Sequence, residues 1–203
     1  MKNRSNVRWL TQIALLAAIL LVLNYTPLGY LQVGPLAASL LTVPVAIGAI
    51  TMGPAAGALL GALFGATSFL QALQGKSVMG GALFAVSPAG YFVVSVIGRV
   101  LMGLCVGLIF AALQKALPKK EKLTCYIAAF CAPFLNTVFY MGLLVAIFYN
   151  SEFVQNLAAK KGATNPLMFI VLVVGVQAVI EWCVCCAVAG TITLPVRKYM
   201  KNN

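Results

Sequence analysis

Long apolar runs, separated by short polar or glycine- and proline-rich stretches, dominate the pattern of this sequence. Runs of about twenty apolar residues are long enough to cross the hydrocarbon core of a bilayer as helices. Because the apolar residues are continuous and do not alternate with polar ones, the pattern predicts helices and not the strands of a membrane barrel. We predict six membrane-spanning helices, over about residues 9–25, 36–51, 55–73, 89–113, 123–148 and 167–194.

Turn-forming and polar residues place the connections between these helices. Residues 26–35, with two prolines and two glycines, are expected to form an outer loop. Residues 74–88 and 149–165 are expected to form two further outer segments, the first of which either dips into the bundle or covers it. The second helix is expected to be short and broken at Pro44. A tight turn at Gly53 follows it on the opposite side of the membrane.

Small residues recur at intervals of four and predict close helix contacts. Four glycines with this spacing extend from the turn into the third helix: Gly53, Gly57, Gly61 and Gly65. Such a stripe lets two backbones approach each other, and it indicates packing and not chemistry. Ala14 and Ala18 form a similar pair in the first helix. This second surface packs either inside the bundle or against a partner.

Composition agrees with the apolar pattern. Of the 203 residues, 62% are hydrophobic and only 8% are charged, whereas soluble domains are about a quarter charged. We therefore predict an all-α membrane protein, a six-transmembrane-helix bundle that forms a single domain over residues 1–203. The length leaves no room for a separate soluble catalytic domain.

The formal net charge of +11 could indicate a nucleic-acid partner, but its distribution argues against one. The basic residues lie at the two ends of the chain and in the short loop 115–122. Lysine and arginine collect in this way on the cytoplasmic side of membrane proteins, where they also contact anionic lipid. We expect both termini in the cytoplasm, in agreement with an even number of spans.

The residues that are missing exclude most chemistry. The sequence contains no histidine and no aspartate, which removes the usual metal clusters and the common general bases. A phosphate-binding loop is also missing, so the chain cannot itself hydrolyse ATP. The six cysteines lie in predicted spans and fit helix packing better than disulfides or a metal site. We predict no enzyme, no metal and no cofactor.

Three of the predicted helices each carry two polar residues one helical turn apart. These pairs are Ser95 with Arg99, Asn136 with Tyr140, and Gln177 with Glu181. A charged residue near the centre of a membrane helix costs about 2.5–3.5 kcal/mol on insertion scales, so such side chains face the bundle interior. At about 1.5 Å of rise per residue, the three pairs lie at similar depths. They predict a polar face inside the bundle.

This polar face either holds a ligand or only joins helices. An ion pair between Arg99 and Glu181, with Asn136 as a further donor, would explain it without a ligand. Aromatic neighbours, Tyr91 among them, favour a binding site, because ligand sites are mostly apolar cavities with a few convergent polar groups. A guanidinium group suits a carboxylate or a carbonyl. We expect the ligand to be a small polar organic molecule.

Several segments together resemble the substrate-binding S components of energy-coupling factor (ECF) vitamin transporters, across essentially the whole chain. The segments are the Ala14-x-x-x-Ala18 stripe, PLGYLQVGPLAASLLTVPVAIGAITMGPAAGALLGALFGATSF (27–69), IGRVLMGL (97–104), APFLNTVFY (132–140) and QAVIE (177–181). The Met-Gly-Pro turn at 52–54, followed by the glycine ladder, is the most specific single piece.

The resemblance implies six helices that bind a vitamin near the outer side of a prokaryotic cell membrane. Carried onto this sequence, the binding positions are Arg99, Asn136, Tyr140, Gln177 and Glu181, with Gln32 and Gly34 in the outer loop. Ser95 and Tyr91, which lie near the same polar face, complete the candidate site.

The resemblance also implies partners. The stripe at Ala14 and Ala18 would contact a membrane-embedded T subunit that is driven by two ABC-type ATPases. The whole S component would then topple in the membrane and expose its site inward.

The Leu28-Gly29-Tyr30 segment and the following Gly34-Pro35 most resemble the pantothenate branch. Riboflavin, hydroxymethylpyrimidine or folate are alternative ligands. Two other classes remain open: a stand-alone secondary transporter with Glu181 as its proton carrier, and an assembly subunit that binds no ligand.

Overall fold

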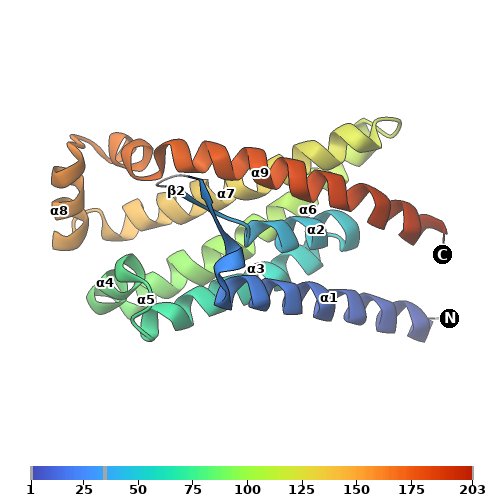
Figure 1. Ribbon diagram of the computed structural model, residues 1–203, viewed down its shortest axis with the longest axis horizontal. Coiled ribbons are helices and arrows are strands. Elements are labelled where there is room, and N and C mark those ends of the chain that lie inside the picture. Colours follow the sequence, from blue (N-terminus) through green and yellow to red (C-terminus); the bar gives the residue numbers. More distant parts are fainter. Residues whose placement is uncertain (1, 34–35, 203) are drawn as a thin grey trace.

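The computed structural model describes residues 2–33 and 36–202, and within these the side chains of residues 7–27, 29 and 39–200. Long helices run side by side and form one elongated bundle, with both termini at the same end (Figure 1). The elements in order are α1 (Lys2–Tyr25), a 3₁₀ turn (Pro27–Gly29), β1 (Tyr30–Val33), β2 (Leu36–Ser39), α2 (Thr42–Met52), α3 (Pro54–Leu73), α4 (Val78–Val86), α5 (Pro88–Phe92), a π-helical segment (Val93–Ile97), α6 (Gly98–Ala116), α7 (Glu121–Phe148), α8 (Glu152–Lys161) and α9 (Pro166–Asn202).

The prediction of a helical, multi-pass bundle is confirmed. Across residues 2–33 and 36–202, five helical stretches are long and apolar enough to cross a membrane: Val7–Tyr25, Pro54–Leu73, Pro88–Ala116, Glu121–Phe148 and Pro166–Met200. The predicted second span is represented by α2, which has only 11 residues. At 1.5 Å per residue α2 covers about 16 Å, roughly half of the hydrocarbon thickness.

The region before α2 differs from the prediction. A continuous helix over residues 36–51 is wrong, because its first residues form β2, which pairs antiparallel with β1. The predicted outer loop 26–35 correspondingly contains a 3₁₀ turn and β1. The amide of Leu40 donates to the carbonyl of Gly29 at 2.8 Å and extends this ladder. Backbone pairing therefore competes with the helix until Thr42.

Pro44 does not break the second helix. It lies in the first turn of α2, where a helix has no internal acceptor for the backbone N–H that proline lacks. From Thr42 to Ile50 every residue of α2 is buried. This short helix contacts α1, α3, α6, α7 and α9, so it forms the centre of the bundle.

The glycine ladder packs α3 against the backbone of α6, as the sequence predicts. A Cβ atom added to Gly57, Gly61 or Gly65 would overlap backbone atoms of Gly103, Arg99 or Ser95, respectively. The first member, Gly53, instead has a φ of +94° and open space around it, so it serves the turn between α2 and α3.

Gly61→Ala is expected to lower the stability of the purified protein by about 1–3 kcal/mol, because the two backbones must separate to admit a methyl group. Gly142→Ala, within α7, is the control: no atom lies within 4 Å of its added Cβ. Thermal unfolding in detergent should show a lower midpoint for Gly61→Ala only. Equal midpoints for the two variants would contradict this account of α3–α6 packing.

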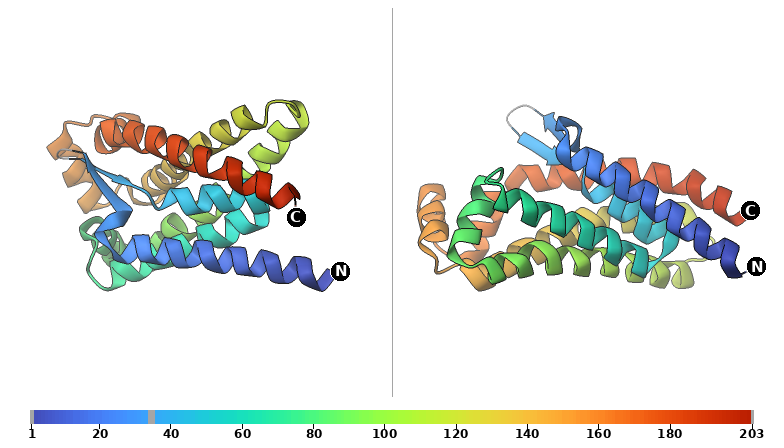
Figure 2. Two further views of the ribbon diagram at one scale, coloured as in Figure 1. Left: turned by 45° about the vertical axis from the view of Figure 1, so that its right-hand side comes forward. Right: turned by 90° about the horizontal axis from the view of Figure 1, so that it is seen from below.

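Short helices cover the end of the bundle that lies away from the termini (Figure 1). Residues 74–88, expected to dip inward or to cover the bundle, contain α4, which packs on α3 and α5. Residues 149–165 contain α8, which lies across the long helices (Figure 2). Ser151 caps α8 by accepting from the amide of Val154. Gly162, in the left-handed conformation, ends it.

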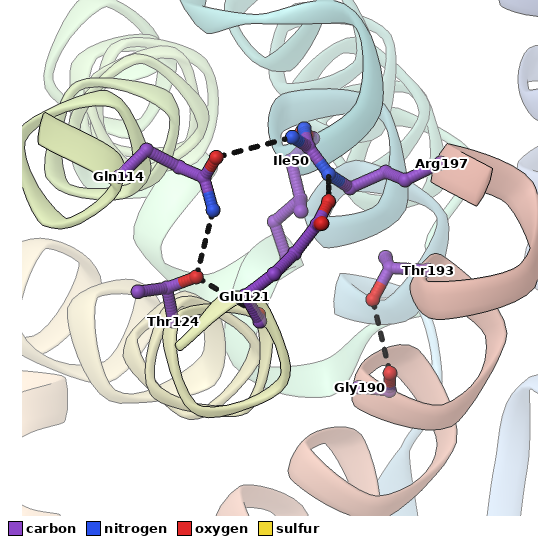
Figure 3. A network of polar contacts seen from close by, with 7 residues as sticks. All are labelled: Ile50, Gln114, Glu121, Thr124, Gly190, Thr193 and Arg197. Atoms are coloured by element: carbon purple, nitrogen blue, oxygen red, sulfur yellow. Dashed lines mark hydrogen bonds and ion pairs between the residues drawn. The ribbon is translucent and has the colours of Figure 1, made fainter. Parts of the chain in front are cut away.

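Arg197 joins four helices at the opposite end (Figure 3). Its Nε donates to Glu121 Oε1 at 2.9 Å, and its other nitrogens donate to the carbonyl of Ile50 and to Gln114 Oε1. Its guanidinium also lies 4.6 Å from the ring centroid of Phe110. The sequence predicts Arg197 only as part of a basic terminus, whereas in the structure it also links α9 to α2, α6 and α7.

Arg197→Ala is expected to destabilise the protein by about 1–3 kcal/mol, because it leaves Glu121 and the Ile50 carbonyl without these donors. The neighbouring Lys198 is exposed, so Lys198→Ala removes the same charge without this cost. Thermal unfolding of the two variants at equal ionic strength measures the difference. A Lys198→Ala midpoint as low as that of Arg197→Ala would show that net charge, and not the network, is responsible.

Candidate functional site

A cavity of about 370 Å³ lies between two apolar clusters, one around α2 and the other toward α4, α5 and α8. Its polar lining consists of Ser39, Ser68, Arg99, Asn136, Thr137, Tyr140, Gln177 and Glu181. Its apolar lining consists of Leu41, Phe64, Met79, Met141, Val173, Val174 and Ala178. These residues come from β2 and α3, α4, α6, α7 and α9, with Leu41 preceding α2. The polar face predicted from the sequence therefore lines a cavity between the helices that is partly open to the outside.

The Arg99 guanidinium lies close to two aromatic rings. Its guanidinium carbon lies 4.3 Å from the ring centroid of Phe64 and 5.1 Å from that of Tyr140, distances at which a cation is attracted to an aromatic face. One nitrogen donates to the carbonyl of Ser95 at 2.7 Å. Ser95 lies in the π-helical segment just before α6, and such segments are frequent at functional sites. The arginine is thus fixed in orientation before any ligand binds.

Asn136 offers an acceptor to a ligand. Its side-chain oxygen is buried and has no hydrogen-bond partner among the residues that the structure describes. A buried acceptor left in this state costs about 1–3 kcal/mol, and a ligand N–H or O–H in the cavity would remove that cost. Thr137 lies beside it and donates to the carbonyl of Pro133.

Tyr91 forms a hydrogen bond with Tyr140. The bond joins their hydroxyl groups, and the ring of Tyr91 stacks on Phe69 with centroids 5.9 Å apart. Tyr91 and Ser95 are both buried but do not line the cavity. These two predicted site residues therefore position Tyr140 and Arg99 and are not in direct reach of a ligand.

Glu181 contacts the hairpin and its own helix. Its Oε1 accepts from the backbone amide of Ser39 at 2.8 Å, and the side chain of Gln177, one turn earlier, also donates to it. The hydrogen bonds described here for Arg99 and Glu181 lead to different parts of the protein. Each of the two side chains therefore has hydrogen-bond partners of its own inside the bundle.

Helix α9 is interrupted beside the cavity. Gly175 has φ +43° and ψ −139°, a combination that only glycine adopts readily. Val173 and Val174 line the cavity before the interruption, and Gln177 lines it after. The apolar run predicts one uninterrupted span here, and the sequence gives no sign of the break at Gly175.

Five of the predicted binding residues line the cavity together: Arg99, Asn136, Tyr140, Gln177 and Glu181. Gln32 lies in β1 opposite Ala37, but its side chain and the whole of Gly34 lie outside the described residues. Three further polar residues of the lining are not predicted from the sequence: Ser39, Ser68 and Thr137. Ser68 lies one helical turn after Phe64 inside an apolar helix. A polar residue in such a position is a sign that could have placed it on the cavity wall.

The predicted coupling surface faces outward. Ala14 and Ala18 are both exposed. Together with α9, α1 is the least buried of the long helices: in each of the two, 11% of the most apolar segment is buried. A largely apolar groove of about 310 Å³ lies between α1, α2 and α9. This outer face of α1 is accessible to a membrane-embedded partner.

An apolar helical bundle with a partly polar cavity between its helices is the architecture of a multi-pass membrane protein. A family model for the ECF transporter substrate-specific component matches residues 8–193, and the chain belongs to this family. Membership implies a transporter component and not an enzyme, with a small-molecule substrate and a membrane-embedded energy-coupling module as its partner. No curated protein sequence gives a significant match to the chain.

Proposed function

We propose that this protein is the high-affinity vitamin-binding subunit of an ECF importer in a prokaryotic plasma membrane, with pantothenate as its ligand. The observation that carries the proposal is that an oriented guanidinium, at Arg99, and a buried acceptor without a partner among the described residues, at Asn136, line the same cavity. A ligand that satisfies both needs an anionic or carbonyl group and a donor.

The size and lining of the cavity favour a small water-soluble molecule. At about 30 Å³ for each water in the liquid, 370 Å³ corresponds to roughly a dozen waters. Pantothenate carries a carboxylate for Arg99, and an amide N–H and hydroxyls for Asn136 and Gln177. Riboflavin, hydroxymethylpyrimidine and folate are the alternatives, and each presents a different set of donors to the same wall.

The proposed topology has six crossings with cytoplasmic termini. Both termini and the connection between α6 and α7 lie at one end of the bundle (Figure 1), and basic residues collect there, as on cytoplasmic surfaces. The sixth crossing is made by α2 with the hairpin above it. The hairpin, α4 and α8 then face outward, on the side from which a nutrient arrives.

A vitamin panel tests the proposal. Purified protein, without ATP, should show a thermal shift with one vitamin, and pantothenate is the expected one. Uptake in cells should stop when the ATPase subunits are deleted. Uptake that continues without them and follows the proton gradient would favour the secondary transporter, and the lack of any shift would favour an assembly subunit.

A further inference from the structure

A serine of α3 lies on the cavity wall just beyond the glycine ladder. Ser68 follows Gly61 by seven residues, or about two helical turns, so it continues the stripe of α3 that faces α6. Gly61 and Gly65 meet the backbone of α6, whereas Ser68 lines the cavity. On this stripe, the cavity therefore begins where the close packing of the two helices ends.

The acceptor that a serine inside a helix ordinarily uses is already occupied. That acceptor is the carbonyl four residues earlier, which for Ser68 belongs to Phe64. The Phe64 carbonyl accepts from the hydroxyl of Thr67 at 2.9 Å, and as part of α3 it also accepts from the backbone N–H of Ser68. A carbonyl oxygen has two lone pairs, so both are in use. Among the residues that the structure describes, none forms a hydrogen bond with the Ser68 hydroxyl, which is thus left to the cavity.

The Ser68 hydroxyl lies near the charged group of the candidate site. The guanidinium of Arg99 is 4.3 Å from the ring centroid of Phe64 and 5.1 Å from that of Tyr140. Ser68 lies one turn after Phe64 on α3, and Asn136 lies one turn before Tyr140 on α7. One turn rises about 5.4 Å, and all five residues line the same cavity. A small ligand that binds Arg99 can therefore reach a neutral polar group on each of these two helices.

A serine hydroxyl matches an alcohol hydroxyl of a ligand. Each of these groups donates one hydrogen bond and accepts up to two, so the pair can bond in either direction without a charge. A ligand with only a hydrocarbon group at this point would leave the serine unpaired. A site built to bind a hydroxyl rejects an analogue that lacks it for this reason.

We propose that Ser68 is a specificity-determining residue, whose hydroxyl group binds an alcohol hydroxyl of the ligand that Arg99 anchors. The inference rests on the proposed function and narrows its substrate class to carboxylates that also carry alcohol hydroxyls. Pantothenate has two alcohol hydroxyls besides its carboxylate, whereas folate has carboxylates and no alcohol hydroxyl.

A cycle of two proteins and two ligands tests this role. The ligands are pantothenate and an analogue in which both alcohol hydroxyls are replaced by hydrogen, and calorimetric titration of the purified full-length protein measures both affinities. The wild type should prefer pantothenate. In Ser68→Ala this preference should fall about fivefold, the size expected for one neutral hydrogen bond. A preference in Ser68→Ala as large as that of the wild type would overturn the proposal.

Two further variants exclude an indirect effect. Ser68→Cys keeps nearly the size of the side chain but offers only a weak donor, so it should lower the preference in the same direction if Ser68→Ala does not fold. Ser151→Ala is the matched control, because it removes a serine hydroxyl that caps α8 and does not line the cavity. Its preference for pantothenate should equal that of the wild type. An equal fall in Ser151→Ala and Ser68→Ala would overturn the proposal.

The ligand that the wild type binds separates this inference from the proposed function. If the wild type binds pantothenate and Ser68→Ala keeps the full preference, only the role of Ser68 is refuted. If it binds folate, riboflavin or hydroxymethylpyrimidine instead, the inference fails, because none of these is a carboxylate with alcohol hydroxyls, and vitamin binding stands. If it binds no member of the panel, the proposed function fails and the inference fails with it.

Discussion

Arg99→Ala is expected to weaken vitamin binding by about 100-fold or more. Truncating one partner of a buried, hydrogen-bonded charge pair typically costs about 2–5 kcal/mol, and every 1.4 kcal/mol is tenfold in affinity. Arg99 is 9% exposed and held between Phe64 and Tyr140, so no other described cavity residue can replace its positive charge. Equilibrium binding of labelled pantothenate to the purified variant measures the loss.

Two controls separate binding from folding in this experiment. Arg99→Lys keeps the charge but loses the planar fork that matches a carboxylate, and it should bind with intermediate affinity. The ligand-free Arg99→Ala protein should unfold near the wild-type temperature, because α6 packs on α3 through the backbone at Gly57 and Gly61. A variant that fails to fold would instead indicate that Arg99 mainly holds helices together.

Ala14→Trp is expected to abolish uptake while leaving vitamin binding within about twofold of the wild type. Ala14 is exposed on α1 and does not line the cavity, so the indole cannot reach a ligand. On a stripe of small residues it prevents the close helix approach that such stripes allow. Uptake in cells that express the complete transporter, compared with binding to the purified subunit, measures both effects.

The same substitution elsewhere on the surface serves as the matched control. Ala111 is exposed on α6, whereas α1 packs mainly on α2 and α3, so Ala111→Trp should support normal uptake. Normal uptake by Ala14→Trp would remove the coupling role of this stripe. Loss of uptake in both variants would indicate a general effect of a bulky side chain on membrane insertion.

Features set by local composition could be predicted from the sequence. The long apolar runs alone place five helical stretches, because a bilayer requires about twenty apolar residues. The glycine spacing at Gly57, Gly61 and Gly65 predicts the close approach that the structure has. The three polar pairs predict a shared interior face, because a buried polar side chain has few other places to go.

Features set by pairing between distant segments could not be predicted. The hairpin before α2 depends on backbone hydrogen bonds, and apolar side chains do not indicate these. The apolar run from residue 36 to residue 51 is also long enough to form a helix. The partner of Glu181 is a backbone amide at Ser39, which any residue except proline would provide. The sequence likewise shows Arg197 only as one of several terminal charges. Its partners, Glu121 and Gln114, are distant in the chain and are brought beside it by the fold.

The central claim is that the polar cavity captures one water-soluble vitamin, and calorimetric titration of the purified wild-type subunit tests it most directly. Without ATP or partner subunits, we predict saturable binding of one pantothenate per chain that is lost in Arg99→Ala. The account would be contradicted if the folded subunit bound no member of the vitamin panel, or if Arg99→Ala bound the same vitamin as tightly as the wild type.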